Sequence, residues 1–446
     1  MLDPHILQLQ IEKLVYGGDG LARLPADEHG RGKAVFVPFV IPGETVEAAV
    51  VESRGGFSRA KLERVVTPSP ERIVPACPYF SRCGGCHYQH LDYAAQLKYK
   101  QEILRETLRR TAKLELQSEI AVHASEPWGY RNRTRMQVRH QPEFALGYFR
   151  YGSHSLLAVE ACPISSPLIN QAIAVIWTLG RDRSIPAGLH GLQLFANHDD
   201  TKLLVEAYVH PGTEAQALQP FGAALHGAIT AVVGVVVFPS APVDDESRQR
   251  APLTATHAEP SQAIGEDKLI YRAAGIEYRV SGGSFFQTNR YLIDSLVEVV
   301  AGQRTGRAAL ELYAGAGLFT AHLARNFDQV IAVESSPHSL ADLRHNAPSN
   351  AKCIRTTTEN FLAERAAKLA PDLVLLDPPR AGLGEKATRA LCRMSASHVT
   401  YVSCDPATLS RDLSVLLESG YRVEQAHLVD LFPQTYHMET VLHLSR

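Results

Sequence analysis

The 446-residue sequence predicts an α/β fold in which a doubly wound parallel sheet follows a small β-barrel and a β-rich, cysteine-bearing region. Two observations predict this order. Apolar runs at 308–313, 330–333, 373–376 and 399–402 are each followed by a loop or helical segment, as in βαβ units. Residues 8–66 instead contain about five short strands separated by Gly and Pro, a pattern typical of an OB-type barrel.

The composition is that of an ordinary soluble globular protein, with 45% apolar and 21% charged residues. The length suffices for about two or three domains. The N-terminus has no signal-peptide pattern, and no run of about 18 apolar residues predicts a membrane span. The seven cysteines are too few for a disulfide scaffold. We therefore expect a cytoplasmic protein with no membrane partner.

Charge is distributed unevenly along the chain. The formal net charge is −2, but residues 50–140 hold 16 Lys and Arg against 9 Asp and Glu. A basic first third is compatible with a polyanion held at one end, although solvated surface charge explains the same count.

The first half of the chain is expected to be mostly β-structure. The predicted segments are strands at 8–15, 34–40, 45–51 and 61–66, an irregular cysteine-rich stretch at 75–90, and a helix at 93–111. A β-rich stretch runs over 130–238. Residues 240–266, rich in Pro, Ser, Asp, Glu and Thr, predict a mobile linker or insertion. The barrel has either an RNA-binding or a purely structural role.

The first strand of the parallel sheet leads into a glycine turn. Gly315 and Gly317 let the backbone approach a ligand closely. The next strand ends at Glu334, which can accept both ribose hydroxyls of an adenosine. No third glycine follows at dinucleotide spacing, and no G-K-[ST] motif is present. With Asp377 after the third strand, the pattern predicts S-adenosylmethionine binding.

Cys404 lies between a strand at 398–403 and a helix expected near Thr408. A buried cysteine is usually a small hydrophobe. Beside a methyl-donor pocket, however, a thiol at a helix N-terminus is expected to be favoured as thiolate and to act as a nucleophile.

A thiol is needed where the methyl acceptor is carbon 5 of a pyrimidine. Attack by thiolate at carbon 6 makes carbon 5 nucleophilic, and after methyl transfer a base must remove the proton from carbon 5. Glu439, at the start of the last strand, is the predicted base, with partial desolvation raising its proton affinity. The alternative is a solvated glutamate on an edge strand.

Four cysteines have metal-ligand character. Cys77, Cys83 and Cys86 form C-x5-C-x2-C, and Cys162 follows far downstream. Four thiolates suit zinc or an iron–sulfur cluster, and the tight spacing favours a cluster. His87 and His90 are possible substitute ligands.

Arginines alternate along 130–139. In a strand, period two puts Arg131, Arg133, Arg135 and Arg139 on one face, where they could contact RNA phosphates. The alternatives are a solvated face or internal ion pairs.

Taken together, these motifs resemble the bacterial RNA uracil-C5 methyltransferase family that forms 5-methyluridine, over nearly the full length. Residues 17–23 are similar to the core of its TRAM domain, an OB-type RNA-binding module, and 284–289 to its F-x-Q-x-N segment. The resemblance implies these roles: [4Fe-4S] ligands Cys77, Cys83, Cys86 and Cys162; donor contacts Gln287, Tyr313, Gly315, Gly317, Glu334 and Asp377; nucleophile Cys404; base Glu439. Glu311, Ala314 and Asp405 depart from the commonest family residues.

We therefore expect a TRAM barrel at 1–67, a β-rich iron–sulfur domain at 68–92 with 125–265, and a class I (Rossmann-like) methyltransferase domain at 93–124 with 266–446. The expected reaction is methylation of uridine C5 in 23S rRNA, because transfer-RNA members commonly lack the cluster and the TRAM domain. Stacking of the extruded base on Phe285 or Phe286 is a further hypothesis.

The alternatives are a transfer-RNA uracil-C5 methyltransferase, an amino-group methyltransferase, for which Arg380 replaces the usual aromatic residue, and an RNA-binding assembly factor with incidental methylation. We expect a monomer with no obligate protein partner.

Overall fold

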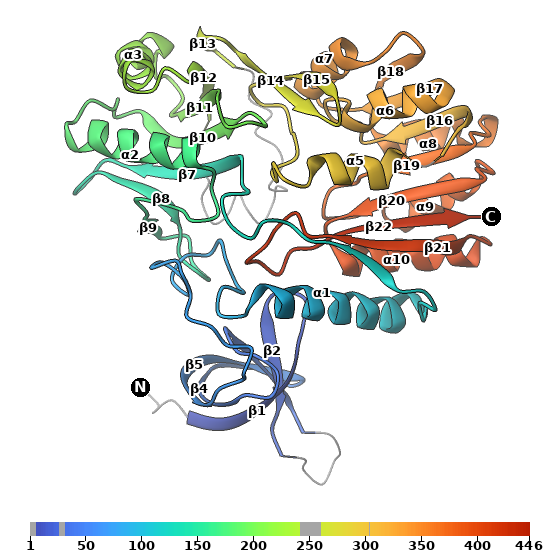
Figure 1. The fold of residues 1–446 in the computed structure, drawn as a ribbon, viewed down its shortest axis with the longest axis horizontal. Helices are drawn as coiled ribbons and strands as arrows, with labels where there is room; N and C mark the ends of the chain where they lie inside the picture. Colours follow the sequence, from blue (N-terminus) through green and yellow to red (C-terminus); the bar gives the residue numbers. More distant parts are fainter. Residues whose placement is uncertain (1–5, 26–31, 241–259, 303) are drawn as a thin grey trace.

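The computed structural model describes residues 6–25, 32–240, 260–302 and 304–446. A small barrel lies below two larger sheets that stand side by side (Figure 1). Most of the predicted linker, 241–259, lies outside the described residues. The end of the predicted linker is described, and Gln262–Gly265 forms an edge strand there. The linker prediction is wrong for these residues because they pair with a neighbouring strand.

The N-terminal barrel is closed, in the order β1-β2-β3-β5-β4, as the sequence predicted. Its strands are β1 Ile6–Leu14, β2 Asp19–Arg23, β3 Ala34–Pro38, β4 Thr45–Ser53 and β5 Phe57–Thr67. Alternating apolar side chains, among them Val35 and Val37, fill the interior. Gly20 is required there, since a Cβ would lie 2.3 Å from Val40.

The central sheet has seven strands in the order β13-β12-β11-β10-β7-β8-β9. Its strands are β7 Arg133–Arg139, β8 Ala145–Phe149, β9 Leu156–Ala158, β10 Leu189–Ala196, β11 Leu203–Val209, β12 Val232–Pro239 and β13 Gln262–Gly265. Two helices, α2 Pro167–Arg181 and α3 Gln219–Ala228, and a 3-10 turn at Ala215–Leu218 lie within the stretch expected to be β-rich. Helix α2 begins where Ser166 caps it and Pro167 fixes the first turn.

The two faces of the central sheet belong to different cores. Leu194 and Val205 pack with α2 and α3, whereas their neighbours Phe195 and Leu204 pack with the C-terminal part of the chain. Because side chains alternate between the two faces of a strand, and both faces of this sheet are buried, β10 and β11 have almost continuously apolar sequences.

The C-terminal sheet has eight strands in the order β18-β17-β16-β19-β20-β22-β21-β6. Its strands are β6 Ile120–His123, β16 Gly306–Leu312, β17 Phe327–Glu334, β18 Ala351–Arg355, β19 Leu373–Leu376, β20 His398–Ser403, β21 Arg422–Val429 and β22 Glu439–Ser445. The first five strands in this order are parallel, but β22 is antiparallel to both neighbours. The expectation of a parallel sheet is therefore wrong for β22, the last strand of the chain.

Helices cover both faces of this sheet (Figure 1). They are α1 Tyr93–Thr107, α5 Ile293–Ala301, α6 Leu318–Asn326, α7 Pro337–Asn346, α8 Thr358–Arg365, α9 Glu385–Cys392 and α10 Pro406–Glu418. A π-helical turn, Leu108–Ala112, extends α1, and a 3-10 turn, Ala366–Lys368, follows α8. A hairpin of β14 Lys268–Ala273 and β15 Ile276–Ser281 precedes α5.

Helix α1 packs on the C-terminal sheet despite its early place in the chain. Its apolar residues Tyr99, Ile103 and Leu104 share a core with β16, β19 and β20. Strand β6 then joins the edge of the same sheet by parallel pairing with β21.

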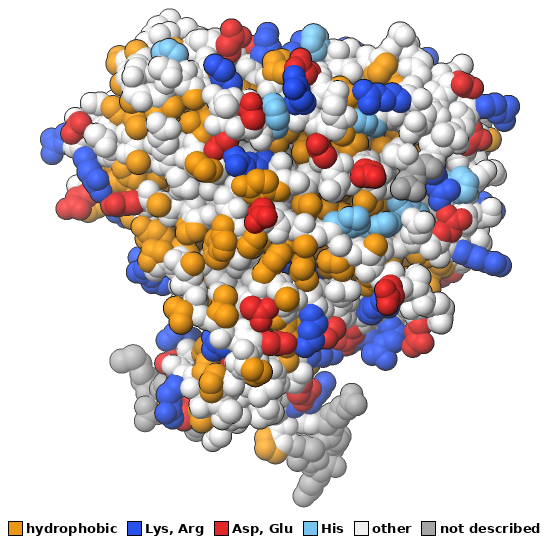
Figure 2. Space-filling view, in the orientation of Figure 1, with side chains coloured by type: hydrophobic (Ala, Val, Ile, Leu, Met, Phe, Trp, Pro, Cys, Tyr) orange, Lys and Arg blue, Asp and Glu red, His pale blue; other side chains and the backbone are white. Residues whose placement is uncertain are grey.

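The face drawn in Figure 2 has basic and acidic side chains interspersed over its described residues, with no single dominant basic area. Among the described helices, none is long and apolar enough to cross a membrane.

Candidate active site and four-cysteine cavity

Cys404 occupies the turn between β20 and α10. Asp405 caps α10: its carboxylate accepts hydrogen bonds from the backbone N–H groups of Ala407, at 2.9 Å, and Thr408, at 3.1 Å. The Tyr16 hydroxyl, from the barrel, donates to the carbonyl oxygen of Cys404 at 3.1 Å. The turn therefore joins the C-terminal sheet to the barrel.

The electrostatic setting of Cys404 differs from the expectation of a favoured thiolate. Burial, followed by the negative charges of Glu439 and Asp377, raises the pKa of the Cys404 thiol to about 12, against the opposing effect of Arg380. The helix N-terminus does not compensate, because the Asp405 carboxylate already accepts its N–H groups. The prediction of a lowered pKa is wrong for the protein without ligands.

Glu439 lies beside this turn. Antiparallel pairing of β20 with β22 matches Ser403 with Thr440, so one step further along brings Cys404 next to Glu439. Because β22 is inside the sheet and the Glu439 residue is only 4% exposed, the alternative of a solvated edge-strand glutamate is wrong.

Three ionisable side chains, those of Glu439, Asp377 and Arg380, interact at this end of the sheet. Burial and the nearby Asp377 raise the pKa of Glu439 well above its ordinary value, although Arg380 opposes the shift. Burial also raises the pKa of Asp377. The raised proton affinity expected for Glu439 is confirmed, and it suits a group that must accept a proton.

The glycine turn after β16 faces the end of β17. The backbone N–H of Gly315 donates to one Glu334 carboxylate oxygen at 2.8 Å, and that of Ser336 donates to the other at 2.6 Å. Gly317 has a φ of 92°, and a Cβ there would lie 2.9 Å from Leu343. A Cβ on Gly315 would meet nothing within 4 Å, so the turn has open space in front of it.

Tyr313 follows β16, and Gln287 lies in the segment between β15 and α5. Tyr313 adopts a left-handed φ of 62°, and its hydroxyl donates to Glu359 at 3.3 Å. Gln287 is 7% exposed and belongs to a segment whose Asn289 amide donates to the Leu431 carbonyl oxygen at 3.1 Å. This bond ties the Gln287 segment to the loop that precedes Glu439.

That loop, 430–438, is held by residues that sequence analysis missed. Lys100 forms a fully buried ion pair with Asp430 at 2.6 Å. Gln434, at a left-handed φ of 67°, accepts at its carbonyl oxygen from the backbone N–H groups of His87 and Tyr88 at 2.9 and 3.0 Å. The signal available in sequence was a lysine on the apolar face of a helix.

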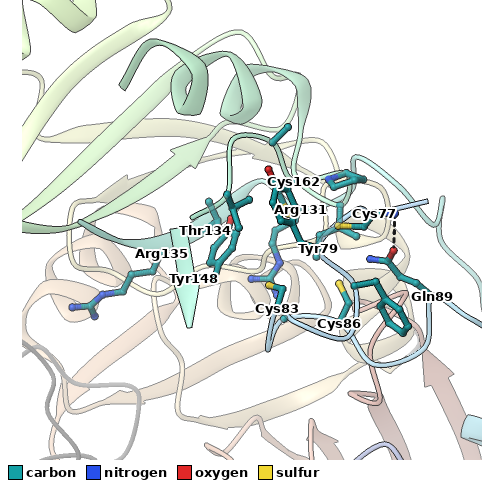
Figure 3. A pocket seen from close by; sticks show the side chains of 16 residues that line it. Cys77, Tyr79, Cys83, Cys86, Gln89, Arg131, Thr134, Arg135, Tyr148 and Cys162 are labelled. Atoms are coloured by element: carbon teal, nitrogen blue, oxygen red, sulfur yellow. Dashed lines mark hydrogen bonds between the residues drawn. The ribbon is translucent and has the colours of Figure 1, made fainter. Parts of the chain in front are cut away.

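The four predicted metal ligands come together from two distant segments. Cys77, Cys83, Cys86 and Cys162 line one cavity of about 250 Å³ (Figure 3). Burial raises the pKa of the Cys83 thiol to about 11. His87 and His90 are not among the residues lining this cavity. His90 instead contacts the Val40 carbonyl oxygen at 3.3 Å, so the alternative of histidine ligands is not supported.

The alternating arginines of residues 130–139 contact other groups of the protein. Arg133 is buried, pairs with Glu206 at 2.7 Å and donates to the Ser284 carbonyl oxygen at 2.6 Å. These contacts hold the segment that carries Gln287, and they leave Arg133 unsuited to phosphate contact. Arg135 lies over the Tyr208 ring at 4.0 Å. Arg131 lines the cysteine cavity.

The two adjacent phenylalanines have opposite environments. Phe286 is 2% exposed and packs 4.9 Å from the Tyr271 ring, so stacking of a base on Phe286 is wrong. Phe285 is 59% exposed and stays a predicted stacking residue.

Comparisons with known proteins identify the family and the domains to which the chain is similar. Residues 261–446 match the family described as tRNA (Uracil-5-)-methyltransferase, and residues 6–62 match the TRAM domain. The chain is 33% identical to the 23S rRNA (uracil(1939)-C(5))-methyltransferase of Chromohalobacter salexigens, over 98% of this chain and 89% of the relative. It is 32% identical to an RNA methyltransferase of Aquifex aeolicus, over 98% and 97% of the two chains.

One solved structure shares the fold over the full length. The tRNA (uracil-54, C5)-methyltransferase of Pyrococcus abyssi, solved with S-adenosyl-L-homocysteine, superposes with a TM-score of 0.74. At 23% identity, the match covers 98% of this chain and 100% of the other.

Proposed function

The chain belongs to the RNA uracil-C5 methyltransferase family, and from that premise we propose that it methylates carbon 5 of a uridine in 23S rRNA through Cys404 and Glu439. The family reaction uses S-adenosylmethionine as methyl donor. The observation that carries the mechanistic proposal is the adjacency of the half-buried Cys404 thiol and the buried, high-pKa Glu439 carboxylate at the end of the donor-site sheet.

The Cys404 thiol gives its proton to solvent, and its sulfur bonds to carbon 6. The carbon 5–carbon 6 π bond breaks as its electrons move toward the carbonyl oxygen on carbon 4, which makes carbon 5 nucleophilic. S-Adenosylmethionine supplies the electrophilic methyl group that carbon 5 takes up. Glu439 removes the proton from carbon 5, the sulfur–carbon bond breaks, and the cysteine is released.

The donor site fits S-adenosylmethionine in the chemistry of its residues. Glu334 is oriented by two backbone N–H groups and offers carboxylate oxygens to ribose hydroxyls. The open space at Gly315 lets an adenosyl group approach the backbone. We propose Tyr313, Gln287, Gly317 and Asp377 as further contacts.

The four-cysteine cavity supports a [4Fe-4S] cluster. Four thiols line one cavity, although in the described part of the chain no group of three or more His, Cys, Asp or Glu side chains is arranged to hold a metal ion. The preference for a cluster over zinc rests on the C-x5-C-x2-C spacing of Cys77, Cys83 and Cys86. When bound, the cluster would cross-link two loops through four thiolates: the loop with Cys77, Cys83 and Cys86, and the loop with Cys162.

The division into parts follows the same proposal: a barrel at 1–67, a cluster domain at 68–92 with 125–265, and a methyltransferase domain at 93–124 with 266–446. The packing of α1 and β6 on the C-terminal sheet supports the inclusion of 93–124 in the last part.

The test uses anaerobically purified protein, S-adenosylmethionine and total RNA from a strain that lacks the gene, with Cys404→Ala in parallel. We expect new 5-methyluridine in 23S rRNA, absent with the variant, by mass spectrometric mapping. 5-Methyluridine in transfer RNA instead would favour a transfer-RNA substrate, as in the description of the matched family. Absence of any mark, from protein that binds the donor, would leave the RNA-binding assembly role.

A further inference from the structure

Arg131 points into the four-cysteine cavity (Figure 3). Its Nε is buried and has no hydrogen-bond partner among the described residues. One Nη donates weakly to the Arg133 carbonyl oxygen at 3.5 Å. Within the described part of the chain, no ion pair joins Arg131 to a carboxylate, in contrast to Arg133 two residues later, which has Glu206.

The ionisable groups facing Arg131 are uncharged in their ordinary forms. They include the phenols of Tyr130 and Tyr148 and the thiol of Cys162. Of these, only a cysteine becomes anionic under ordinary conditions, when its thiolate binds a metal. A guanidinium enclosed by neutral groups is costly, because charge removed from water needs a partner.

We propose that Arg131 is the charge-compensating partner of the metal–thiolate group held by Cys77, Cys83, Cys86 and Cys162. The proposal rests on the proposed function, in that it takes the cavity to hold an iron–sulfur cluster. Four thiolates around iron and sulfide carry net negative charge, and a cation beside them stabilises the reduced, more negative form most.

The backbone holds Arg131 rigidly at this place. Its N–H donates to the Ile164 carbonyl oxygen at 2.8 Å, and its own carbonyl accepts from the Ser166 N–H at 2.9 Å. Both partners follow Cys162 closely in sequence, so the cation and this ligand belong to one hydrogen-bonded unit. Arg131 also lies 6.0 Å from the Phe432 ring, which belongs to the loop before Glu439.

Arg135 provides a matched control. It contributes to the lining of the same cavity from the same segment, but its guanidinium lies over the Tyr208 ring and points away from the thiols (Figure 3). Arg131→Met and Arg135→Met thus remove the same charge from nearby positions, and only the first removes it from among the cysteines. Arg131→Lys retains a charge in the cavity.

The experiment uses the full chain, loaded anaerobically with iron and sulfide. Iron and acid-labile sulfide are measured first, and the midpoint potential is then determined by reductive titration followed by electron paramagnetic resonance. With Arg131→Met we expect the reduced form to lose at least tenfold in relative stability, which for one electron is about 59 mV toward more negative potential. Arg131→Lys and Arg135→Met should change it less than threefold.

Thermal unfolding of loaded and metal-free protein separates this role from plain packing. Arg131→Met should destabilise the loaded protein but leave the metal-free protein as stable as the native sequence, or more so, because an unpaired buried cation is removed. Equal destabilisation of both forms, with an unchanged potential, would overturn the proposal. If Arg131→Met fails to keep its cluster while Arg131→Lys keeps it, the proposal stands.

The native protein alone tests the premise. If it holds no iron and sulfide after anaerobic purification and loading, the cluster assignment fails, and the role of Arg131 with it. If it holds both, a null result with Arg131→Met counts against Arg131 only.

Discussion

Lys100 and Asp430 form an ion pair in the interior of the protein, with Nζ and Oδ1 2.6 Å apart and neither side chain exposed. The Tyr93 hydroxyl donates to the other Asp430 oxygen at 2.9 Å. Lys100 also donates to the Phe432 carbonyl oxygen at 3.1 Å. Helix α1, far from Cys404 and Glu439 in sequence, thereby holds the start of the loop that leads to Glu439.

Replacing one partner of this pair should destabilise the protein strongly. In Lys100→Met, Asp430 remains as an unpaired buried carboxylate, and we expect a loss of about 3–5 kcal/mol in the free energy of unfolding, measured in urea. The double variant Lys100→Met with Asp430→Asn should recover part of that loss. If the double variant is as unstable as the sum of both single variants, the ion pair does not couple the two residues.

Glu439→Gln should trap the enzyme on its RNA. Without a base to remove the proton from carbon 5, the sulfur–carbon bond formed by Cys404 cannot be released by elimination. We expect a denaturant-resistant protein–RNA complex on gels in the presence of S-adenosylmethionine, and none with Cys404→Ala added. Full turnover by Glu439→Gln would show that another group is the base.

Thiol reactivity should report the charge of the donor. Since burial, Glu439 and Asp377 raise the pKa of Cys404 to about 12, alkylation of this thiol at pH 8 should be slow in protein without donor. The positive sulfonium of S-adenosylmethionine should lower that pKa and accelerate alkylation, measured on the Cys404 peptide by mass spectrometry. S-Adenosylhomocysteine, nearly identical in shape but lacking this charge, is the control. Equal rates with both compounds would contradict this electrostatic explanation.

Glu311→Gln should change how stability depends on pH. Burial raises the pKa of Glu311 to about 8, despite a hydrogen bond from Thr320. A carboxyl with a raised folded-state pKa contributes stability below pH 4.5 that is lost as pH rises toward 8. The uncharged variant should therefore be more stable than the native protein by roughly 2–4 kcal/mol at pH 8, and similar to it near pH 5. A pH-independent difference in urea unfolding would exclude this titration.

Alanine substitutions at Phe285 and Phe286 should separate an effect on RNA affinity from an effect on the stability of the fold. Phe285→Ala removes an exposed ring, so we expect RNA affinity to fall by about 1–3 kcal/mol with stability unchanged. Phe286→Ala opens a cavity in the core and should lower the free energy of unfolding by about 3–5 kcal/mol. Filter binding and urea unfolding measure the two effects. Unchanged RNA affinity in Phe285→Ala would remove this residue from the interface.

Local signals in the sequence were sufficient for the barrel, the glycine turn and the alternation of strands and helices after residue 308. Each depends on residues close in the chain, such as Gly315 and Gly317 after an apolar strand. The central region was harder to predict: its strands are buried on both faces, so the alternation that distinguishes strands from helices is weak, and α2 and α3 went unrecognised.

The sequence by itself determined which residue types are available for the chemistry: the thiol of Cys404, the carboxylate of Glu439 and four cysteines at characteristic spacing. Only the tertiary structure decided their environments. Arg133 became an internal ion-pair partner, Arg131 entered the cysteine cavity, and the Cys404 pKa rose instead of falling. The physical reason is that burial and charge interactions depend on groups distant in the chain, whereas sequence patterns report mainly on neighbours.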